Sequence, residues 1–328
     1  MHVSYRRAAG FACAAGLALF SVSGNAQNGA YPTKPIRFVI ANSAGGGLDV
    51  TARLTGPVLI GSLGQQVIYD NRGGAAGSVA AETVSKAPPD GYTMLMGSIG
   101  NIAVNPHVYK NLAYDPLKDL APVTFAVSGS NVLVVHPTVP AKSVQELVAL
   151  LRSKPGGLTY ASSGSGNAGH LAGELFQSMT KTKMTHVPYK GGGPSAQALI
   201  AGETALSFVD VITALPQAEA KRLRPIATST AKRTQLMPDL PTIAESGLPG
   251  FESVTSFAMF APAATPKEPL ARVHRELLKA LGAADIREKL RVQGIDAVGT
   301  TPEELVAHQK QETAKWGKVI REQHIKFE

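Results

Sequence analysis

Short apolar runs alternate with segments that carry helix-start signals along most of the chain. Helix starts are indicated by "SVQE", a capping box at Ser143, and by "TPEE" at Thr301, which places Pro302 at the first helical position. Short apolar runs between helical segments are typical of strands in parallel sheets. The alternation therefore predicts an α/β fold. The predicted strands cover residues 36–41, 66–70, 92–97, 131–136, 158–162, 184–189, 205–210 and 224–230.

Two segments break this alternation, because they are long and strand-like and contain no helix. They cover residues 119–137 and 251–266. Two such connectors predict that the chain leaves a first domain, builds a second domain and returns. The predicted first domain comprises residues 27–127 plus 255–328, and the inserted second domain comprises residues 128–254. The alternative is two sequential domains, but no Gly/Ser/Pro-rich linker marks such a boundary.

The first residues have the pattern of a secretory signal. "MHVSYRR" is basic, and the apolar stretch after it is short and rich in small residues, which is untypical of a membrane span. "GNA", ending at Ala26, is a typical cleavage site. We therefore predict that residues 1–26 are a cleaved signal peptide and that the protein is exported. A retained N-terminal anchor is the alternative.

Composition excludes several classes of function. Cys13 is the only cysteine and lies in the predicted signal, so the mature chain has no disulfide, reactive thiol or thiolate metal site. The chain carries 32 Lys and Arg against 24 Asp and Glu, a formal net charge of +8, which weakly favours anionic partners. The basic residues are scattered and there is one Trp, so we predict no nucleic-acid binding. The eight histidines show no ligand spacing, and we predict no metal site.

Glycine-rich segments follow five of the predicted strands. In an open parallel sheet, ligands bind beyond the carboxyl ends of the strands, so these segments are expected to converge on one cleft. Glycine lets the backbone approach a ligand, and each following helix offers unpaired N–H groups and a positive dipole end. The arrangement predicts a site that binds an anion without contacts from Lys or Arg side chains. Any single loop, taken alone, is also consistent with a simple turn. The segments are residues 43–49, 71–78, 97–101, 162–170 and 190–195.

The known phosphate-binding patterns are absent from these loops. No loop contains Gly-x4-Gly-Lys-Ser/Thr. Gly45 and Gly47 have the spacing of the dinucleotide pattern, but Val50 stands where its third glycine belongs. We therefore predict no nucleotide and no other cofactor, and a small carboxylate as the bound anion.

"SSGSGNAGH" admits a second interpretation, an exported hydrolase. Ser163 or Ser165 would be the nucleophile, His170 the base and Asp210 the residue that orients it. Neither serine lies in a Gly-x-Ser-x-Gly elbow, so we predict a binding protein and not an enzyme. Asp210 is alternatively an acceptor for a ligand donor or a tie between two loops. Asp49 is predicted to cap the first helix, with a carboxylate facing the cleft as the alternative.

Several long motifs together resemble a known family. "NRGGAAGSVAAETVSKAPPDGYTML", "TYASSGSGNAGHLAGELF" and "HVPYKGGGPSAQALIAGE" occur in order, with "FAPAATP" after them. They resemble the substrate-binding receptors of tripartite tricarboxylate transporters, the Bug family. The resemblance implies a two-domain periplasmic binding protein of the type II-like class. Each domain is then a mainly parallel sheet flanked by helices, with the ligand cleft between the domains.

The resemblance also implies a function and a set of site residues. A monomeric receptor closes on a carboxylated solute and delivers it to the membrane subunits of a tripartite tricarboxylate-type transporter, with a signalling sensor as the alternative recipient. One carboxylate of the ligand is expected between the first two loops, and the distal end at the third loop and the second domain. The implied residues are Ser43, Ala44, Gly45, Gly46, Asp49, Gly74 and Ala75 for the carboxylate, and Ser98, Asn101, Ser162, Ser163, Asn167, His170, Lys190 and Asp210 for the distal end.

Two details of the sequence refine these expectations. Gly56 and Pro57 interrupt the first helix, which predicts a kink or a shorter helix. An Asp49 that caps the helix is unavailable to an ammonium group. We therefore expect a mono- or dicarboxylate ligand without an amine.

Overall fold

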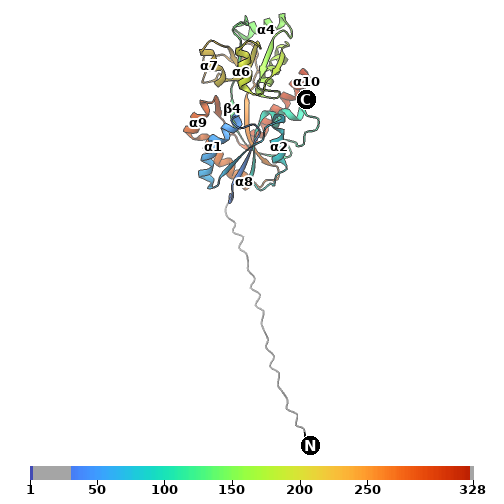
Figure 1. The fold of residues 1–328 in the computed structure, drawn as a ribbon, viewed down its shortest axis with the longest axis vertical. Coiled ribbons are helices and arrows are strands. Elements are labelled where there is room, and N and C mark those ends of the chain that lie inside the picture. Colours follow the sequence, from blue (N-terminus) through green and yellow to red (C-terminus); the bar gives the residue numbers. More distant parts are fainter. Residues whose placement is uncertain (3–30, 326–328) are drawn as a thin grey trace. The chain divides into compact units, whose positions relative to one another are not determined.

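The computed structural model describes residues 1–2 and 31–325 (Figure 1), so most of the predicted signal peptide, with Cys13, lies outside the described residues. Residues 31–325 contain two sheets. All eight strands predicted from the apolar runs are present, with ends within two residues of the predicted ones. The first sheet has the order β11-β4-β10-β3-β1-β2, with β1 (Ile36–Ile40), β2 (Val67–Asn71), β3 (Thr93–Ser98), β4 (Leu120–Gly129), β10 (Thr255–Pro262) and β11 (Ile295–Ala297). The second has the order β7-β6-β8-β5-β9, with β5 (Asn131–Val135), β6 (Thr159–Ser162), β7 (Thr185–Pro188), β8 (Leu206–Asp210) and β9 (Arg224–Thr228).

The α/β class is confirmed, but both sheets are mixed where mainly parallel sheets were expected. In the first sheet β1 is parallel to β2 and β3, while β10 is antiparallel to β3 and β4. In the second sheet β6 is parallel to β7 and β8, while β5 is antiparallel to β8 and β9. The chain enters the first sheet again on β10 and the second sheet on β5, and β11 is also antiparallel to its neighbour β4. Such strands are not joined by βαβ units, which are what impose a parallel direction.

The chain passes between the sheets twice, at neighbouring positions. β4 ends at Gly129 in the first sheet, and β5 begins at Asn131 in the second. The return enters the first sheet at Thr255, which pairs with Gly129 in the antiparallel β4 and β10 ladder. Both passages therefore lie side by side on the two strands that the sequence marks as connectors.

Helices cover both sheets (Figure 1). Thr301 forms the predicted capping box with Glu304, and Pro302 begins the last helix. Ser143 caps its helix through the Glu146 N–H, but the Glu146 carboxylate accepts from Lys142 and leaves the second half of that box unformed. The helices are α1 (Gly47–Leu63), α2 (Ser78–Ser85), α3 (Asn105–Val108), α4 (Val144–Ser153), α5 (Ala168–Thr180), α6 (Gly192–Ile200), α7 (Val211–Glu219), α8 (Lys267–Gly282), α9 (Ala284–Arg291) and α10 (Pro302–Gln323), with the shorter helical turns η1 (Ala75–Gly77) and η2 (Gly100–Val104).

The expected shortening of α1 does not occur, because the helix continues through Pro57 to Leu63. Gly56, just before the proline, has a packing role. A Cβ atom at this position would lie 1.7 Å from the hydroxyl oxygen of Tyr69. The Gly-Pro pair therefore lets β2 pack closely on an unbroken helix.

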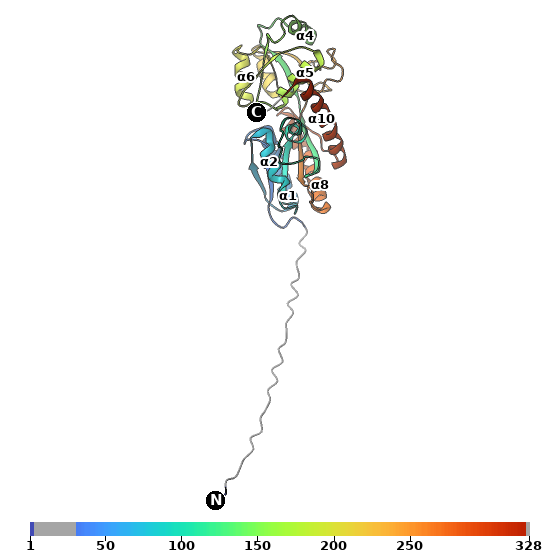
Figure 2. The same cartoon turned by 90° about the vertical axis from the view of Figure 1, so that its right-hand side faces the viewer.

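The C-terminal helix α10 contacts elements of both sheets. It packs on β4 and η2 beside the first sheet and on α5 beside the second (Figure 2). At the second contact the Ser178 hydroxyl donates to Glu322 Oε2 at 2.5 Å. Trp316, at 1% exposure, anchors the middle of the helix in the core.

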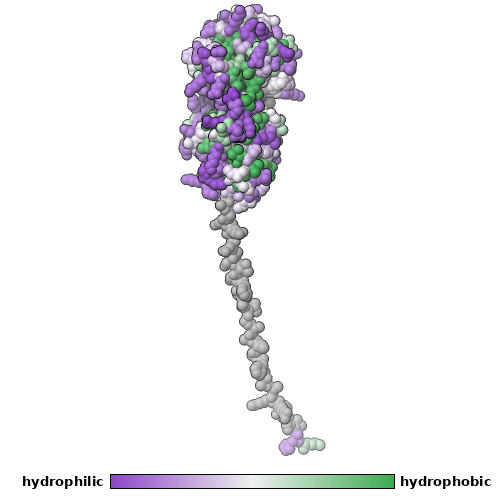
Figure 3. Space-filling view, turned by 90° about the vertical axis from the view of Figure 1, so that its left-hand side faces the viewer, coloured by the Kyte–Doolittle hydropathy of each residue, from purple (hydrophilic) through white to green (hydrophobic). Residues whose placement is uncertain are grey.

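Exposed apolar side chains are distributed over several elements. Figure 3 shows apolar residues among hydrophilic ones on the side of α7 and α9. Ile212 in α7 and Val292 after α9 are 38% and 52% exposed. Single exposed apolar residues are common on soluble proteins, and they do not by themselves mark a binding surface.

Candidate functional site

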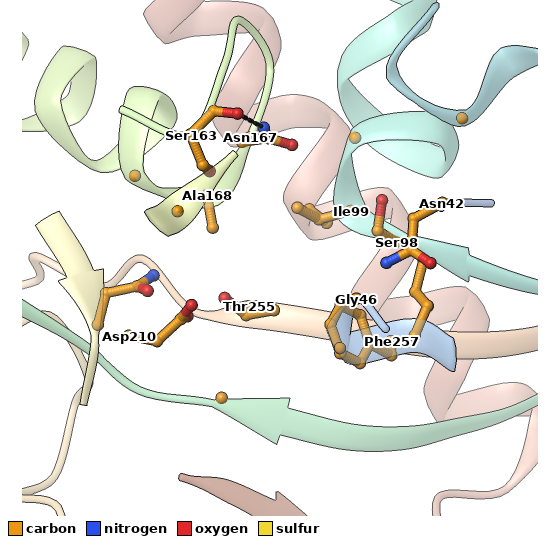
Figure 4. A pocket seen from close by; sticks show the side chains of 18 of the residues that line it. Asn42, Gly46, Ser98, Ile99, Ser163, Asn167, Ala168, Asp210, Thr255 and Phe257 are labelled. Atoms are coloured by element: carbon orange, nitrogen blue, oxygen red, sulfur yellow. Dashed lines mark hydrogen bonds between the residues drawn. The ribbon is translucent and has the colours of Figure 1, made fainter. Parts of the chain in front are cut away.

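A cavity of about 580 Å³ lies where the glycine-rich loops of the two sheets meet (Figure 4). The first residues of α1, α5 and α6 line it, and so does Asp210 at the start of α7. Helix N-termini present unpaired N–H groups and the positive end of the helix dipole. Four of them at one cavity produce a site suited to an anion. The expected convergence of the glycine loops is therefore seen in the structure.

The structure brings eight of the fifteen expected site residues to the cavity wall. Asp210 and Ser163 come from the second sheet, and Gly46 and Ser98 from the first (Figure 4). The other seven lie outside the lining. The eight lining residues are Ser43, Gly45, Gly46, Gly74, Ser98, Ser163, Asn167 and Asp210, and the seven others are Ala44, Asp49, Ala75, Asn101, Ser162, His170 and Lys190.

The first loop is held from behind by Asp49. The helix begins two residues earlier than this aspartate, with Gly46 as its N-cap, so the predicted cap at Asp49 is wrong. Asp49 is 3% exposed, and its Oδ2 accepts the backbone N–H of Gly45 at 2.9 Å. Burial alone would raise the pKa of this carboxyl, but hydrogen bonds from Arg53, Gly45 and Asn71 together hold it below its usual value. Asp49 is therefore an ionised support of the loop.

The second loop has an unusual backbone. Gly74, Ala75, Ala76 and Gly77 all have positive φ, at 104°, 45°, 50° and 82°. Alanine in this region is strained by about 1–2 kcal/mol, and such strain often accumulates at ligand sites. Gly74 and Ala76 line the cavity, while the exposed Ala75 lies outside its lining.

Asn101 positions the third loop from the interior. It is fully buried, and its Oδ1 accepts the backbone N–H of Ser98 at 3.1 Å. A Cβ on Gly77 would lie 2.5 Å from Asn101 Nδ2, so the second and third loops pack directly together. Ser98 itself lines the cavity.

Behind the fourth loop lies a pair of histidines, of which His170 is buried and His186 is half-buried. His170 is 5% exposed, and its Nδ1 accepts the Gly166 N–H at 3.0 Å. Its ring stacks on His186 with centroids 4.1 Å apart. Burial, together with the charge of His186, lowers the pKa of His170 to about 3. Ser162 is 1% exposed, and its Oγ shares a 2.7 Å hydrogen bond with His186 Nε2.

These contacts shape the loop that carries Ser163 and Asn167. Asn167 Nδ2 donates to the Ser163 carbonyl at 2.9 Å, and both residues line the cavity (Figure 4). A histidine with a pKa of about 3 is a poor general base at neutral pH. The arrangement of this loop therefore gives little support to the hydrolase interpretation.

Lys190 and Asp210, the last two expected residues along the chain, differ in position. Lys190 is exposed and lies outside the cavity lining. Asp210 lines the cavity and is exposed there to solvent, while desolvation by the protein around the cavity raises the pKa of its carboxyl.

Sequence reasoning missed several lining residues. Thr255, Ser256 and Phe257 belong to β10, whose segment was marked as a connector but not as part of the site. Asn131 lies directly opposite Asp210 in the antiparallel β5 and β8 pair. An expected parallel sheet gave no reason to place these two side chains together. Other lining residues that were missed are Asn42, Ser195 and Gln293, while Ser165, expected only as a hydrolase nucleophile, also lines the cavity.

Two further observations concern the part of the chain that the structure describes. Within residues 1–2 and 31–325, no helix is both long and apolar enough to cross a membrane. Across the same residues, no group of three or more His, Cys, Asp or Glu side chains is arranged to hold a metal ion.

Comparison with known families identifies the family of the chain. The family model described as "Tripartite tricarboxylate transporter family receptor" matches residues 52–325. The chain belongs to this family. The resemblance inferred from the sequence motifs is thereby confirmed, and the family consists of solute receptors.

Two curated relatives extend over nearly the whole chain. The chain is 36% identical over 311 residues to the UPF0065 protein in the tcbD-tcbE intergenic region of Pseudomonas sp. strain P51, covering 94% of this chain and 92% of the relative. It is 32% identical over 298 residues to Protein BugT of Bordetella pertussis, covering 90% of this chain and 91% of the relative.

Solved structures of family members have the same fold. R. palustris Rpa4515 with adipate superimposes with a TM-score of 0.81 at 37% identity, covering 90% of this chain and 99% of that chain. MatC (Rpa3494) from Rhodopseudomonas palustris with bound malate gives a TM-score of 0.77 at 29% identity, covering 88% of this chain and all of that one. The periplasmic binding protein BugD superimposes with a TM-score of 0.77 at 28% identity, covering 90% of this chain and 99% of that chain.

Proposed function

We propose that this protein is a periplasmic receptor that binds a small organic carboxylate in the cavity and delivers it to the membrane subunits of a tripartite transporter. The observation that carries the proposal is the convergence of helix N-termini and glycine loops on a cavity whose lining, among the described residues, contains no Lys or Arg. Hydrogen bonds to a charged group each contribute about 1.5–3 kcal/mol net. Several of them suffice for a micromolar carboxylate site, at about −8 kcal/mol.

The relatives with bound ligands support this substrate class. The two ligand-bound relatives hold adipate and malate, which are both small carboxylates. The proposal also includes the signal peptide over residues 1–26 and the division into residues 27–127 plus 255–328 and the inserted residues 128–254. Closure would be a movement of these two domains about the paired passages at Gly129 and Thr255.

Thermal unfolding in the presence of matched ligands tests the proposal. The protein is expressed with its own N-terminal segment, purified after export, and tested with carboxylates and with their neutral amides. A ligand at about a hundred times its dissociation constant stabilises the folded state by about 2.7 kcal/mol. We expect the acids, and not the amides, to raise the midpoint. Equal stabilisation by the amides, or consumption of the compound, would overturn the receptor function and favour the hydrolase.

A further inference from the structure

Asp210 is a carboxylate at the cavity wall that the fold does not use. It ends β8 and is the N-cap residue of α7, yet its side chain caps no N–H of that helix. Among the described residues, none donates a hydrogen bond to this carboxylate or forms an ion pair with it. Figure 4 shows it on the opposite side of the pocket from Asn42 and Gly46. A ligand carboxylate held at the first loop would therefore extend towards it.

The rest of the cavity provides no positive side chain to balance this charge. Asp210 is the only lining residue, within the described part of the chain, whose side chain is ionisable. The other polar lining side chains are neutral hydroxyls and amides. They are Asn42, Ser43, Ser98, Asn131, Ser163, Ser165, Asn167, Ser195, Thr213, Thr255, Ser256 and Gln293.

We propose that Asp210 selects the ligand, so that the receptor takes a carboxylate whose far end carries an ammonium group and discriminates against a dicarboxylate of the same length. The inference rests on the proposed carboxylate-receptor function and narrows its substrate class. A second ligand carboxylate would face Asp210 with helix N-termini and neutral donors nearby but no cationic side chain among the described lining residues, and two carboxylates that share a site disfavour each other's ionised forms. An ammonium group would give Asp210 the partner that the fold does not supply.

This substrate class replaces the amine-free ligand expected from the sequence. That expectation assigned the available carboxylate to Asp49 and considered it occupied by the helix. Asp49 is occupied, but it lies behind the first loop and outside the cavity lining. The carboxylate that faces a ligand is Asp210, and it has no such role in the fold.

Asn131 adds a neutral group beside Asp210. Directly opposed residues of an antiparallel pair project on the same face of the sheet, with Cβ atoms about 4.5–5.5 Å apart. Asn131 and Asp210 are such a pair, and both line the cavity. Asn131 Nδ2 is buried and has no hydrogen-bond partner within the described residues. Asn131 Nδ2 can donate to a ligand oxygen, but a neutral amide does not compensate the charge of Asp210.

A matched ligand series tests the inference. Isothermal titration at pH 8 compares dicarboxylates with ω-amino carboxylates of equal length, from about four to six carbons, and includes adipate and 6-aminohexanoate. We expect the wild-type protein to bind the amino acid at least about tenfold more tightly than the dicarboxylate at its preferred length, since one pKa unit of interaction corresponds to a factor of ten. Asp210→Asn should abolish or reverse this preference. Asp239→Asn, the same change at an exposed position outside the cavity, should leave it intact.

The outcomes separate this inference from the function on which it rests. If the wild-type protein binds the dicarboxylate as tightly as the amino acid at every length, the inference is overturned and the carboxylate receptor stands. The inference is also overturned if a folded Asp210→Asn protein shows the same ratio of affinities for the amino acid and the dicarboxylate as the wild type. If no carboxylate of the series binds, the proposed function fails and the inference fails with it. If Asp210→Asn does not fold, the inference is decided by whether the wild-type protein binds the amino acid more tightly than the dicarboxylate of equal length.

Discussion

Asp49 accepts the backbone N–H of Gly45 at 2.9 Å, so a side chain inside α1 holds the loop that precedes the helix. The same carboxylate accepts from Arg53 Nε and from Asn71 Nδ2, and it thereby joins the first two glycine loops. A loop that binds an anion through its backbone must already have the correct conformation, because flexible N–H groups would lose entropy on binding. Asp49 provides this order from outside the cavity.

Asp49→Ala is expected to lower both stability and ligand affinity. The variant loses hydrogen bonds to a charged and buried acceptor, which cost about 1–3 kcal/mol of unfolding free energy. Asp49→Asn retains an acceptor for the Gly45 N–H, so its stability and ligand affinity should fall less than those of Asp49→Ala. Denaturant unfolding and titration with the best carboxylate measure both effects. An Asp49→Ala protein with wild-type affinity would show that the loop needs no support from this residue.

The pH dependence of Asp49 has a definite sign. Its folded pKa lies below the unfolded value, so its contribution to stability is present above the unfolded pKa and is lost as the pH falls through the folded pKa. Asp49→Asn should therefore be less stable than the wild type at pH 7, with the difference shrinking below about pH 4. Denaturant unfolding of both proteins across this range gives the comparison.

Substitution by alanine is expected to have different effects at Gly46, the N-cap of α1, and at Gly61 inside the same helix: only the first should lower ligand affinity. A Cβ on Gly46 would lie 2.2 Å from Asn42 Nδ2, so Gly46→Ala must displace a side chain at the cavity wall. We expect its carboxylate affinity to fall by about tenfold or more, the equivalent of one lost hydrogen bond to a charge. Gly61 lies inside α1 with no atom within 4 Å of such a Cβ.

Gly61→Ala serves as the matched control for this prediction. It should raise the unfolding free energy by about 0.5–1 kcal/mol, because alanine has the higher helix propensity, and leave affinity unchanged. Equal affinities of the two variants would argue against close approach of the ligand to the first loop.

Asp210→Asn is expected to stabilise the protein without ligand at neutral pH. The folded state raises the pKa of Asp210, so its contribution to stability is present below the unfolded pKa and is lost as the pH rises through the folded pKa. Asparagine stays neutral and avoids this loss. The midpoint of Asp210→Asn should exceed that of the wild type by more at pH 8 than at pH 4. A lower midpoint at pH 8 would indicate a structural role for the carboxylate.

His170 should make the protein sensitive to mild acid. Its pKa is lowered from 6.5 to about 3, so the unfolded state takes up a proton first as the pH falls below 6.5. Unfolding free energy should then decrease by up to about 1.4 kcal/mol per pH unit for this residue between pH 6 and 4. In His170→Gln the unfolding free energy should decrease less steeply as the pH falls. If its dependence on pH equals that of the wild type, the ring of His170 is already accessible to protons in the native state.

The sequence predicted the strands and the site loops better than the detailed contacts of the site. Apolar runs and glycine loops are local signals, and Ser98, Ser163 and Asp210 lie at the cavity because strand ends share one edge of a sheet. Asn101 and His170 have the same local context, yet they point into the interior and orient the loops. Which side of a loop a polar side chain faces depends on packing with distant segments, and a single sequence carries no signal for it.

Within residues 31–325 no cationic side chain lines the cavity, and this affects the rate of ligand capture. Fixed positive charges attract an anion over roughly a Debye length, whereas the field of a helix end is limited to its first turn. A lining of backbone N–H groups thus acts almost at contact and does not steer the solute into the cleft. Association should then depend little on ionic strength, and differences in affinity between solutes should arise mainly from how long each remains bound.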